Sequence, residues 1–128
     1  MRTLVTGEGY RGVDGTATQF SDVVADLTDY RSCVPGLFMR HVLEHNYRWA
    51  EILDNALASF TERMVLVTFI PFSESTHEIA YNWSCGVPDI SFRLSDLTDH
   101  FGSEVQWTME TLETKSQYNT ETIFFLSR

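Results

Sequence analysis

The sequence has little cysteine. Cys33 and Cys85 are the two cysteines among 128 residues, and they do not form a CxxC pair. Two cysteines are too few for a disulfide framework, which excludes a small disulfide-rich scaffold. We interpret both as ordinary thiols that are buried or half-buried, because free cysteine is among the most buried residue types.

Basic residues are also scarce. Nine lysines and arginines stand against 18 aspartates and glutamates, which gives a formal net charge of −9. A surface of this sign repels a phosphate backbone, so we expect no nucleic-acid partner.

Long apolar runs are missing as well. No run approaches the roughly 20 residues that span a bilayer, and the N-terminus lacks the apolar region of a signal peptide. We therefore expect a cytoplasmic protein with no membrane contact. The chain has no repeats, and its hydrophobic content of 43% predicts a packed globule, which we expect to be one domain over residues 1–128.

The stretch from Pro35 to Phe72 organises the chain. It starts with a short apolar run typical of a buried strand: Leu37, Phe38, Met39 and Val42. Asn46 can cap a helix of about 14 residues, whose apolar face recurs from Trp49 to Phe60. The segment 64–69 (MVLVTF) hardly alternates, which predicts a strand that is covered on both sides.

Two buried strands joined by a helix predict a right-handed parallel crossover. In open parallel sheets the ligand crevice lies outside the carboxyl ends of the strands. The residues expected at that edge follow the first strand and the second strand: Arg40, His41, Glu44 and His45, then Phe72, Ser73, Glu74 and Ser75.

Two short strands are expected before this unit, and a helix and a hairpin after it. Residues 11–13 form the first strand, with Asp14 at its carboxyl end, and residues 20–26 form the second. After a loop at 73–89, residues 94–101 predict a helix capped by Ser95. Residues 104–112 and 121–126 predict an antiparallel hairpin. The predicted class is α/β with a mixed sheet.

This order of elements resembles the Rossmann-like (class I) S-adenosylmethionine-dependent methyltransferases over residues 10–128. The resemblance is most specific at Tyr10–Asp14 (YRGVD) and at Met39–His45 (MRHVLEH), which a predicted amphipathic helix follows. It implies a minimal Rossmann-like methyltransferase sheet of parallel strands with a C-terminal antiparallel hairpin. Most of the family's first strand and glycine loop is missing, so the chain resembles a truncated or degenerate member.

The resemblance also implies roles for single residues. Asp14 would hold the ribose hydroxyls of S-adenosylmethionine, and Asp26 with Leu27 would lie near the adenine. Gly7 and Gly9 would be the remnant of the glycine loop. Arg40 and His41 would lie near the methionine part of the cofactor, where Arg40 can clamp a carboxylate.

Catalysis is expected from a histidine at this edge. Methyl transfer to a small-molecule hydroxyl or amine needs a base that removes the acceptor's proton, and His41 or His45 could serve. Structural roles stay open: His41 can pack under the helix, and Glu44 can pair with Arg48. Asp14 before Gly15, and Asp26 after a strand, can equally be turn residues.

The same five residues, His41 to His45, also spell the H-x-x-E-H motif of inverted zinc peptidases. Zinc binding would need both imidazoles on one helical face. A strand up to Val42 and a helix beginning at Asn46 break that geometry, so we predict no metal site.

The remaining expectations concern the acceptor, the assembly and a second function. Four aromatic residues could line an acceptor pocket: Trp83, Phe92, Trp107 and Tyr118. A sheet without its first strand should leave an unpaired edge or apolar surface, which predicts a homo-oligomer whose neighbouring subunit can complete the pocket. The alternative function is a non-catalytic, methyltransferase-derived binding or assembly module.

Overall fold

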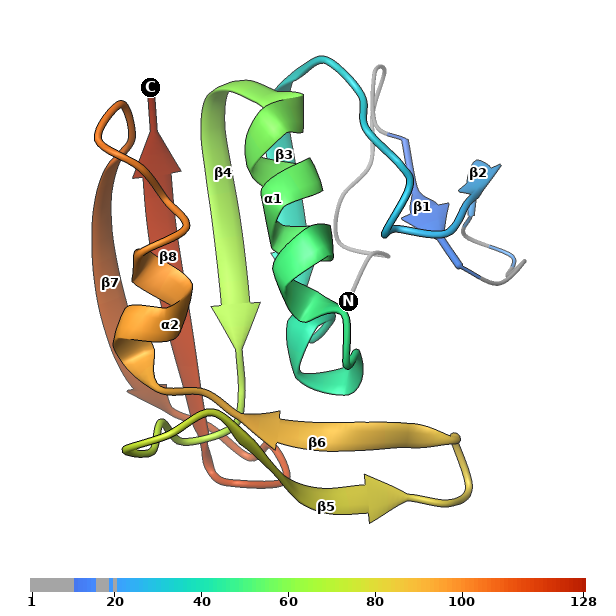
Figure 1. Ribbon diagram of the computed structural model, residues 1–128, viewed down its shortest axis with the longest axis vertical. Helices are drawn as coiled ribbons and strands as arrows, with labels where there is room; N and C mark the ends of the chain where they lie inside the picture. Colours follow the sequence, from blue (N-terminus) through green and yellow to red (C-terminus); the bar gives the residue numbers. More distant parts are fainter. Residues whose placement is uncertain (1–10, 16–18, 20) are drawn as a thin grey trace.

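The structure is a computed structural model that describes residues 11–15, 19 and 21–128 (Figure 1). The candidate glycines Gly7 and Gly9 lie outside the described residues. No helix in the described part of the chain is long and apolar enough to cross a membrane.

The main sheet has four strands in the order β3-β4-β8-β7. β3 (Val34–Arg40) pairs parallel with β4 (Phe60–Thr68), and α1 (Trp49–Ser59) connects them. β8 (Thr120–Ser127) is antiparallel to β4, and β7 (Gln106–Glu113) is antiparallel to β8. The predicted parallel crossover and the predicted terminal hairpin are both confirmed.

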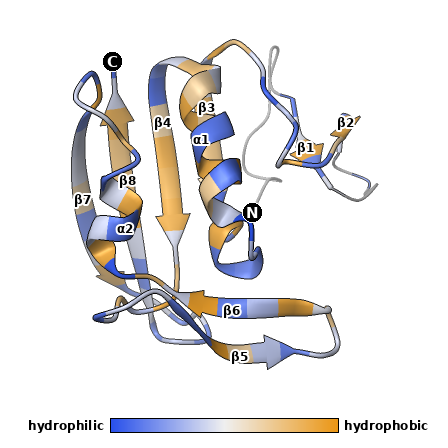
Figure 2. Cartoon of the chain, in the orientation of Figure 1, coloured by the Kyte–Doolittle hydropathy of each residue, from blue (hydrophilic) through white to orange (hydrophobic). Residues whose placement is uncertain are grey.

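α1 forms because its apolar residues share one face, which Figure 2 shows as alternating hydrophilic and hydrophobic bands. Leu53 is fully buried in the core. The helix has 11 residues and is shorter than predicted, because Phe60 begins β4. The predicted Asn46 cap is wrong: its amide donates to the carbonyl of Val42 at 2.6 Å, and Arg48 precedes the helix without a side-chain cap.

β3 is less buried than predicted. Phe38 is 45% exposed, and only Met39 is buried in this strand. The reason is visible in Figure 1, where α1 and α2 (Leu94–Thr98) both lie in front of the sheet. The far face of β3 has no helix over it among the described residues.

The predicted loop at 73–89 is wrong. β5 (His77–Asn82) and β6 (Val87–Ser91) form an antiparallel hairpin that extends away from the main sheet (Figure 1). Asn82 closes the turn by accepting hydrogen bonds from the backbone N–H groups of Ser84 and Cys85. Gly86 completes it with a φ of +71°, a conformation that glycine adopts without strain.

The core lies between the main sheet and the two helices. α2 is shorter than predicted and starts after Arg93, whereas Ser95 lies inside it. Figure 2 shows β4 in mostly hydrophobic colours. Both cysteines are exposed, so the prediction of buried or half-buried thiols is wrong. The core includes residues of both helices and three strands: Leu53, Leu57, Leu97, Met39, Met64, Leu66, Phe124 and Leu126.

A second, two-stranded sheet holds the start of the described chain. β1 (Val13–Asp14) pairs parallel with β2 (Val23–Val24). Figure 1 shows these strands on the opposite side of α1 from β4. Among the described residues these two strands do not join the main sheet, so this part of the chain has a mixed four-stranded main sheet and a separate two-stranded sheet, and the predicted single Rossmann-like sheet is confirmed only in its β3-β4-β8-β7 part.

Candidate functional site

Polar side chains from three segments gather around Phe69 where β3 and β4 end. Arg40 is the last residue of β3, and Phe69 directly follows β4. Because β8 is antiparallel to β4, its first residues lie at the same edge of the sheet. We call this group the rim cluster; its members are Arg40, His41, Glu44, His45, Phe69, Asp89, Tyr118 and Glu121.

His41 lies at the centre of one half of the rim cluster. Its Nε2 lies 2.6 Å from Glu121 Oε1, and the same oxygen accepts a hydrogen bond from Arg40 Nη2 at 2.7 Å. A carboxylate only accepts, so Nε2 carries the proton and Nδ1 keeps its lone pair. The His41 backbone has a φ of +55°, which is rare for a residue with a side chain. This conformation is held by the hydrogen bond to Glu121 and by the bond from the His41 backbone N–H to the carbonyl of Val67.

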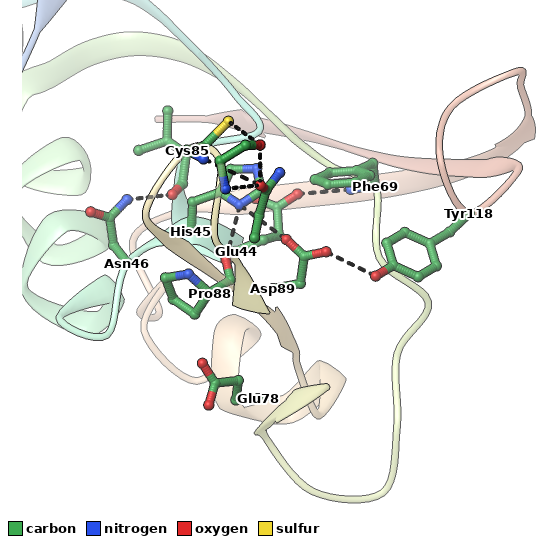
Figure 3. A network of polar contacts seen from close by, with 12 residues as sticks. Glu44, His45, Asn46, Phe69, Glu78, Cys85, Pro88, Asp89 and Tyr118 are labelled. Atoms are coloured by element: carbon green, nitrogen blue, oxygen red, sulfur yellow. Dashed lines mark hydrogen bonds and ion pairs between the residues drawn. The ribbon is translucent and has the colours of Figure 1, made fainter. Parts of the chain in front are cut away.

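His45 lies at the centre of the other half (Figure 3). It belongs to the short 3₁₀ helix η2 (Leu43–His45), and its Nδ1 donates to the carbonyl of Pro88 at 3.0 Å. Asp89 Oδ1 lies 3.4 Å from the same nitrogen, while Asp89 Oδ2 accepts a hydrogen bond from the Tyr118 hydroxyl at 2.9 Å. In each histidine, one ring nitrogen therefore donates a hydrogen bond: Nε2 in His41 and Nδ1 in His45.

Phe69 joins the two halves. Its ring centroid lies 4.5 Å from that of His41, 5.5 Å from that of His45 and 5.8 Å from that of Tyr118. The aromatic contacts fix the relative positions of both imidazoles.

Glu44 is the fully buried member of the rim cluster. Its Oε2 accepts a hydrogen bond from the backbone N–H of Phe69 at 2.9 Å, whereas Oε1 has no partner among the described residues. The predicted pair of Glu44 with Arg48 is wrong, because Arg48 pairs with Glu51 on the exposed surface.

Burial sets the protonation of the rim cluster. It raises the pKa of Glu44 to about 7, so this carboxyl holds its proton over much of the acidic range. Burial, helped by the charge of Arg40, lowers the pKa of His41 against the opposing pull of Glu121, so that His41 is neutral at pH 7. Burial and the bond to Asp89 raise the pKa of Tyr118.

The other candidate residues lie on the two-stranded sheet. Asp26 Oδ1 accepts hydrogen bonds from the backbone N–H and the hydroxyl of Thr28, which lower the pKa of its carboxyl. This is the turn role that the sequence left open. Leu27 packs against the core, and its carbonyl accepts from Asn55. Asp14 is half-buried in β1, and its carbonyl accepts from the N–H of Ala25.

The predicted aromatic group does not line one pocket. Phe92 is buried against Trp49, Trp107 packs against Phe101, and Trp83 is 86% exposed on the hairpin. Tyr118 alone belongs to the rim cluster. Ser73 and Glu74 line an open depression of about 680 Å³ that includes no residue of the rim cluster.

The H-x-x-E-H residues do not adopt a zinc-binding geometry. His41 lies in the left-handed region, outside the helical turn that contains His45. Among the described residues no three His, Cys, Asp or Glu side chains are grouped as metal ligands.

Sequence reasoning missed Glu121 and Asp89 as site residues. Glu121 had a usable signal: it begins a strand predicted to run antiparallel, and such a strand starts at the edge where the parallel strands end. Asp89 had none, because the hairpin that carries it was predicted as a loop.

Comparisons with known proteins show the fold. No family model matches the chain, and no curated protein matches it. The N-terminal domain of EvdMO1 with S-adenosylhomocysteine (SAH) bound is 13% identical with a TM-score of 0.56, covering 82% of this chain and 52% of that one. The same domain in the presence of SAH and D-fucose is 13% identical with a TM-score of 0.57, covering 86% and 55%.

A third solved structure is the Pnkp1/Rnl/Hen1 RNA repair complex. It is 15% identical with a TM-score of 0.50, covering 88% of this chain and 26% of that one. The present chain thus spans about half the length of the EvdMO1 domain. At these identities the comparisons establish one conclusion: the chain has the fold of a domain that binds SAH.

Proposed function

We propose that this chain is an S-adenosylmethionine-dependent methyltransferase that acts on a small-molecule acceptor, with the rim cluster as its active site. The observation that carries the proposal is the His41–Glu121 pair at 2.6 Å, located where β3 and β4 end. In open parallel sheets this edge is where ligands bind. The fold shared with an SAH-bound domain supports the same cofactor.

The groups present fit such a cofactor and acceptor. S-adenosylmethionine supplies a methyl group on a positively charged sulfur when bound. The Arg40 guanidinium, whose side chain is 27% exposed, can pair with a carboxylate at the rim. Asp14 lies on the adjoining small sheet as the candidate for the ribose hydroxyls.

His41 acts as the base. Its Nδ1 lone pair takes the proton of the acceptor's hydroxyl or amine as the acceptor atom gains its methyl group. Glu121 keeps the proton of the resting imidazole on Nε2 and stabilises the imidazolium that forms. His45 has the same arrangement against Pro88 and Asp89 and is the second candidate for this role.

The two EvdMO1 structures suggest where to look for the acceptor. One of them was obtained in the presence of D-fucose. A panel of sugars, sugar nucleotides, phenols and amines is therefore the first choice for an assay.

A non-catalytic binding module is the second candidate function, and Asp26 favours it. The Asp26 Oδ1 accepts two hydrogen bonds from Thr28, which is the role of a turn residue and needs no ligand. A module of this kind would keep the sheet and the rim cluster without methyl transfer.

Two measurements separate these functions. Isothermal titration with SAH should give a saturable signal, and labelled S-adenosylmethionine should transfer its methyl group to a member of the panel. SAH binding without any transfer would favour the module, and no SAH binding at all would reject the methyltransferase. When His41→Gln is assayed, His100→Gln is its matched control. His100 Nδ1 lies 2.7 Å from Asp54 Oδ1, and this pair is outside the rim cluster.

A further inference from the structure

The second face of the main sheet is apolar and has no helix over it in the described part of the chain, although Val67 on this face is buried. Both helices pack on the face that carries Met39, Leu66 and Phe124. Strand residues alternate between faces, so the neighbours of these core residues point to the other side. There, Phe38 is 45% exposed and Phe125 is 42% exposed.

The register of the four strands places these residues in rows. Phe38 lies beside Val65, Val65 beside Phe125, and Phe125 beside Thr108. The next row along the strands consists of Arg40, Val67, Ile123 and Glu110. We call these two rows the open face.

The sequence already indicated that this face is covered. β4 hardly alternates, and both Val65 and Val67 point to the open face while Met64 and Leu66 point into the core. A strand with apolar residues on both sides is typical of a sheet that is packed on both sides. Exposed apolar patches of this kind mark interaction sites.

Charge identifies the occupant. The chain as a whole has a formal net charge of −9, but the second row has an arginine at one end and a glutamate at the other. A strongly basic partner would be attracted to the acidic remainder of the surface. The second row of the open face has one positive and one negative side chain, so its charges cancel and do not favour such a partner. A surface with a cation at one edge and an anion at the opposite edge is complementary to itself under a twofold rotation.

We propose that the open face binds the open face of a second copy of this chain, with a twofold axis parallel to the strands and between β4 and β8. That axis stacks β4 on the partner's β8 and β3 on the partner's β7. Val65 then packs on the partner's Phe125, and Arg40 reaches the partner's Glu110. Aligned sheets cross at about 30°, which leaves the central apolar contacts in place and lets long side chains meet at the edges.

The dimer adds a residue to the candidate site. Arg40 belongs to the rim cluster, where it and His41 both contact Glu121. The partner's Glu110 would place a second carboxylate beside the same guanidinium. The dimer does not depend on methyl transfer, and it can be tested whether or not an acceptor is found.

Sedimentation velocity tests the dimer. The wild-type protein should sediment as a dimer, and Phe125→Glu should raise the dissociation constant by about 100-fold or more, as expected for a central apolar contact. Ile79→Glu is the matched control, because Ile79 is also 42% exposed but lies on the β5–β6 hairpin. It should leave the dimer intact. Circular dichroism checks that both variants fold.

A charge reversal tests the axis. Glu110→Arg would place a second cation beside the partner's Arg40, so it should also raise the dissociation constant of the dimer. A monomeric wild type, a dimer unaffected by Phe125→Glu, or a dimer unaffected by Glu110→Arg would each overturn the proposal.

Discussion

The rim cluster and the β1–β2 sheet both contain acidic residues at strand ends, but they use them differently. Glu121 pairs with His41, 80 residues earlier in the sequence, and Tyr118 bonds to Asp89, 29 residues earlier. On the small sheet, Asp26 bonds to Thr28, two residues later. One region has polar contacts that only the complete fold can form, while the other has a local turn.

This difference supports the rim cluster as the proposed active site. Half-buried charges lose hydration and need partners, so a protein retains them where they serve a purpose or where they fix the structure. The Asp26 turn needs no such explanation, because an Asx turn forms on the surface of many loops. We therefore propose that catalysis takes place at the rim cluster, and we expect the small sheet at most to assist binding.

Substitutions of His41 and Asp26 should affect methyl transfer very differently. His41→Gln should lower the rate of methyl transfer by about 10²- to 10⁴-fold, the usual contribution of a general base. Asp26→Asn should leave the turnover number within about twofold, because it does not touch the reacting atoms. Initial rates with labelled S-adenosylmethionine and an acceptor found in the panel measure both. Equal losses in the two variants would contradict the assignment.

The two regions should also differ in stability. Leu53→Ala, in the fully buried part of α1, should lower the free energy of unfolding by about 3 kcal/mol, since it removes transfer energy and leaves a cavity. Val24→Ala, at a position 56% exposed on β2, should change it by less than about 0.5 kcal/mol. Urea denaturation followed by tryptophan fluorescence measures both variants. A large effect at Val24 would show that the small sheet is part of the core.

Glu44 gives the rim a distinctive pH dependence. Its pKa rises from an ordinary 4.5 to about 7 on folding. Between these values the folded protein binds more protons than the unfolded one, so stability falls as the pH rises from 4.5 through 7. Each pKa unit corresponds to about 1.4 kcal/mol, so the free energy of unfolding should fall by about 3 kcal/mol over this range. Glu44→Gln should abolish this fall.

The test for Glu44 compares urea unfolding of the wild type and the variant from pH 4.5 to 8. His41 works in the opposite direction, because its pKa is lowered on folding and its contribution rises with pH near its ordinary value of 6.5. That contribution is present in both proteins and cancels in the difference. Parallel stability curves would mean that Glu44 is not a buried acid.

Arg40 should influence catalysis through the pKa of His41. Burial and then the Arg40 charge lower the pKa of His41. Arg40→Gln removes the charge, so the pKa of His41 should rise and the acidic limb of the pH–rate profile should move to higher pH. Arg93→Gln, an exposed arginine at the start of α2, should leave the limb in place. A limb that stays fixed in Arg40→Gln would remove His41 as the titrating base.

The sequence predicted the crossover because periodicity is local and strong there. Leu53 and its neighbours define one helix face, and residues 64–69 define a buried strand. The β5–β6 hairpin was missed because Pro88, whose ring removes a backbone donor, and an irregularity between Glu78 and Ala80 disturb the alternation that identifies strands.

The site was predictable only in part. Arg40, His41 and His45 were predicted to lie at one edge because they follow a predicted strand directly, and the structure places them together there. Their partners Glu121 and Asp89 come from other elements, and a contact across 80 residues has no local signature in the sequence. The Asn46 cap failed for a related reason, since η2 occupies the place where the helix was expected to begin.

The most direct measurement follows the imidazole signals of His41 and His100 by NMR while the protein is titrated with SAH. Both histidines pair with a carboxylate, but only His41 belongs to the rim cluster. We predict that the His41 signal shifts in proportion to SAH binding and that the His100 signal stays in place. A bound protein in which His41 does not respond, or no binding at all, would contradict the assignment of the rim cluster as the active site.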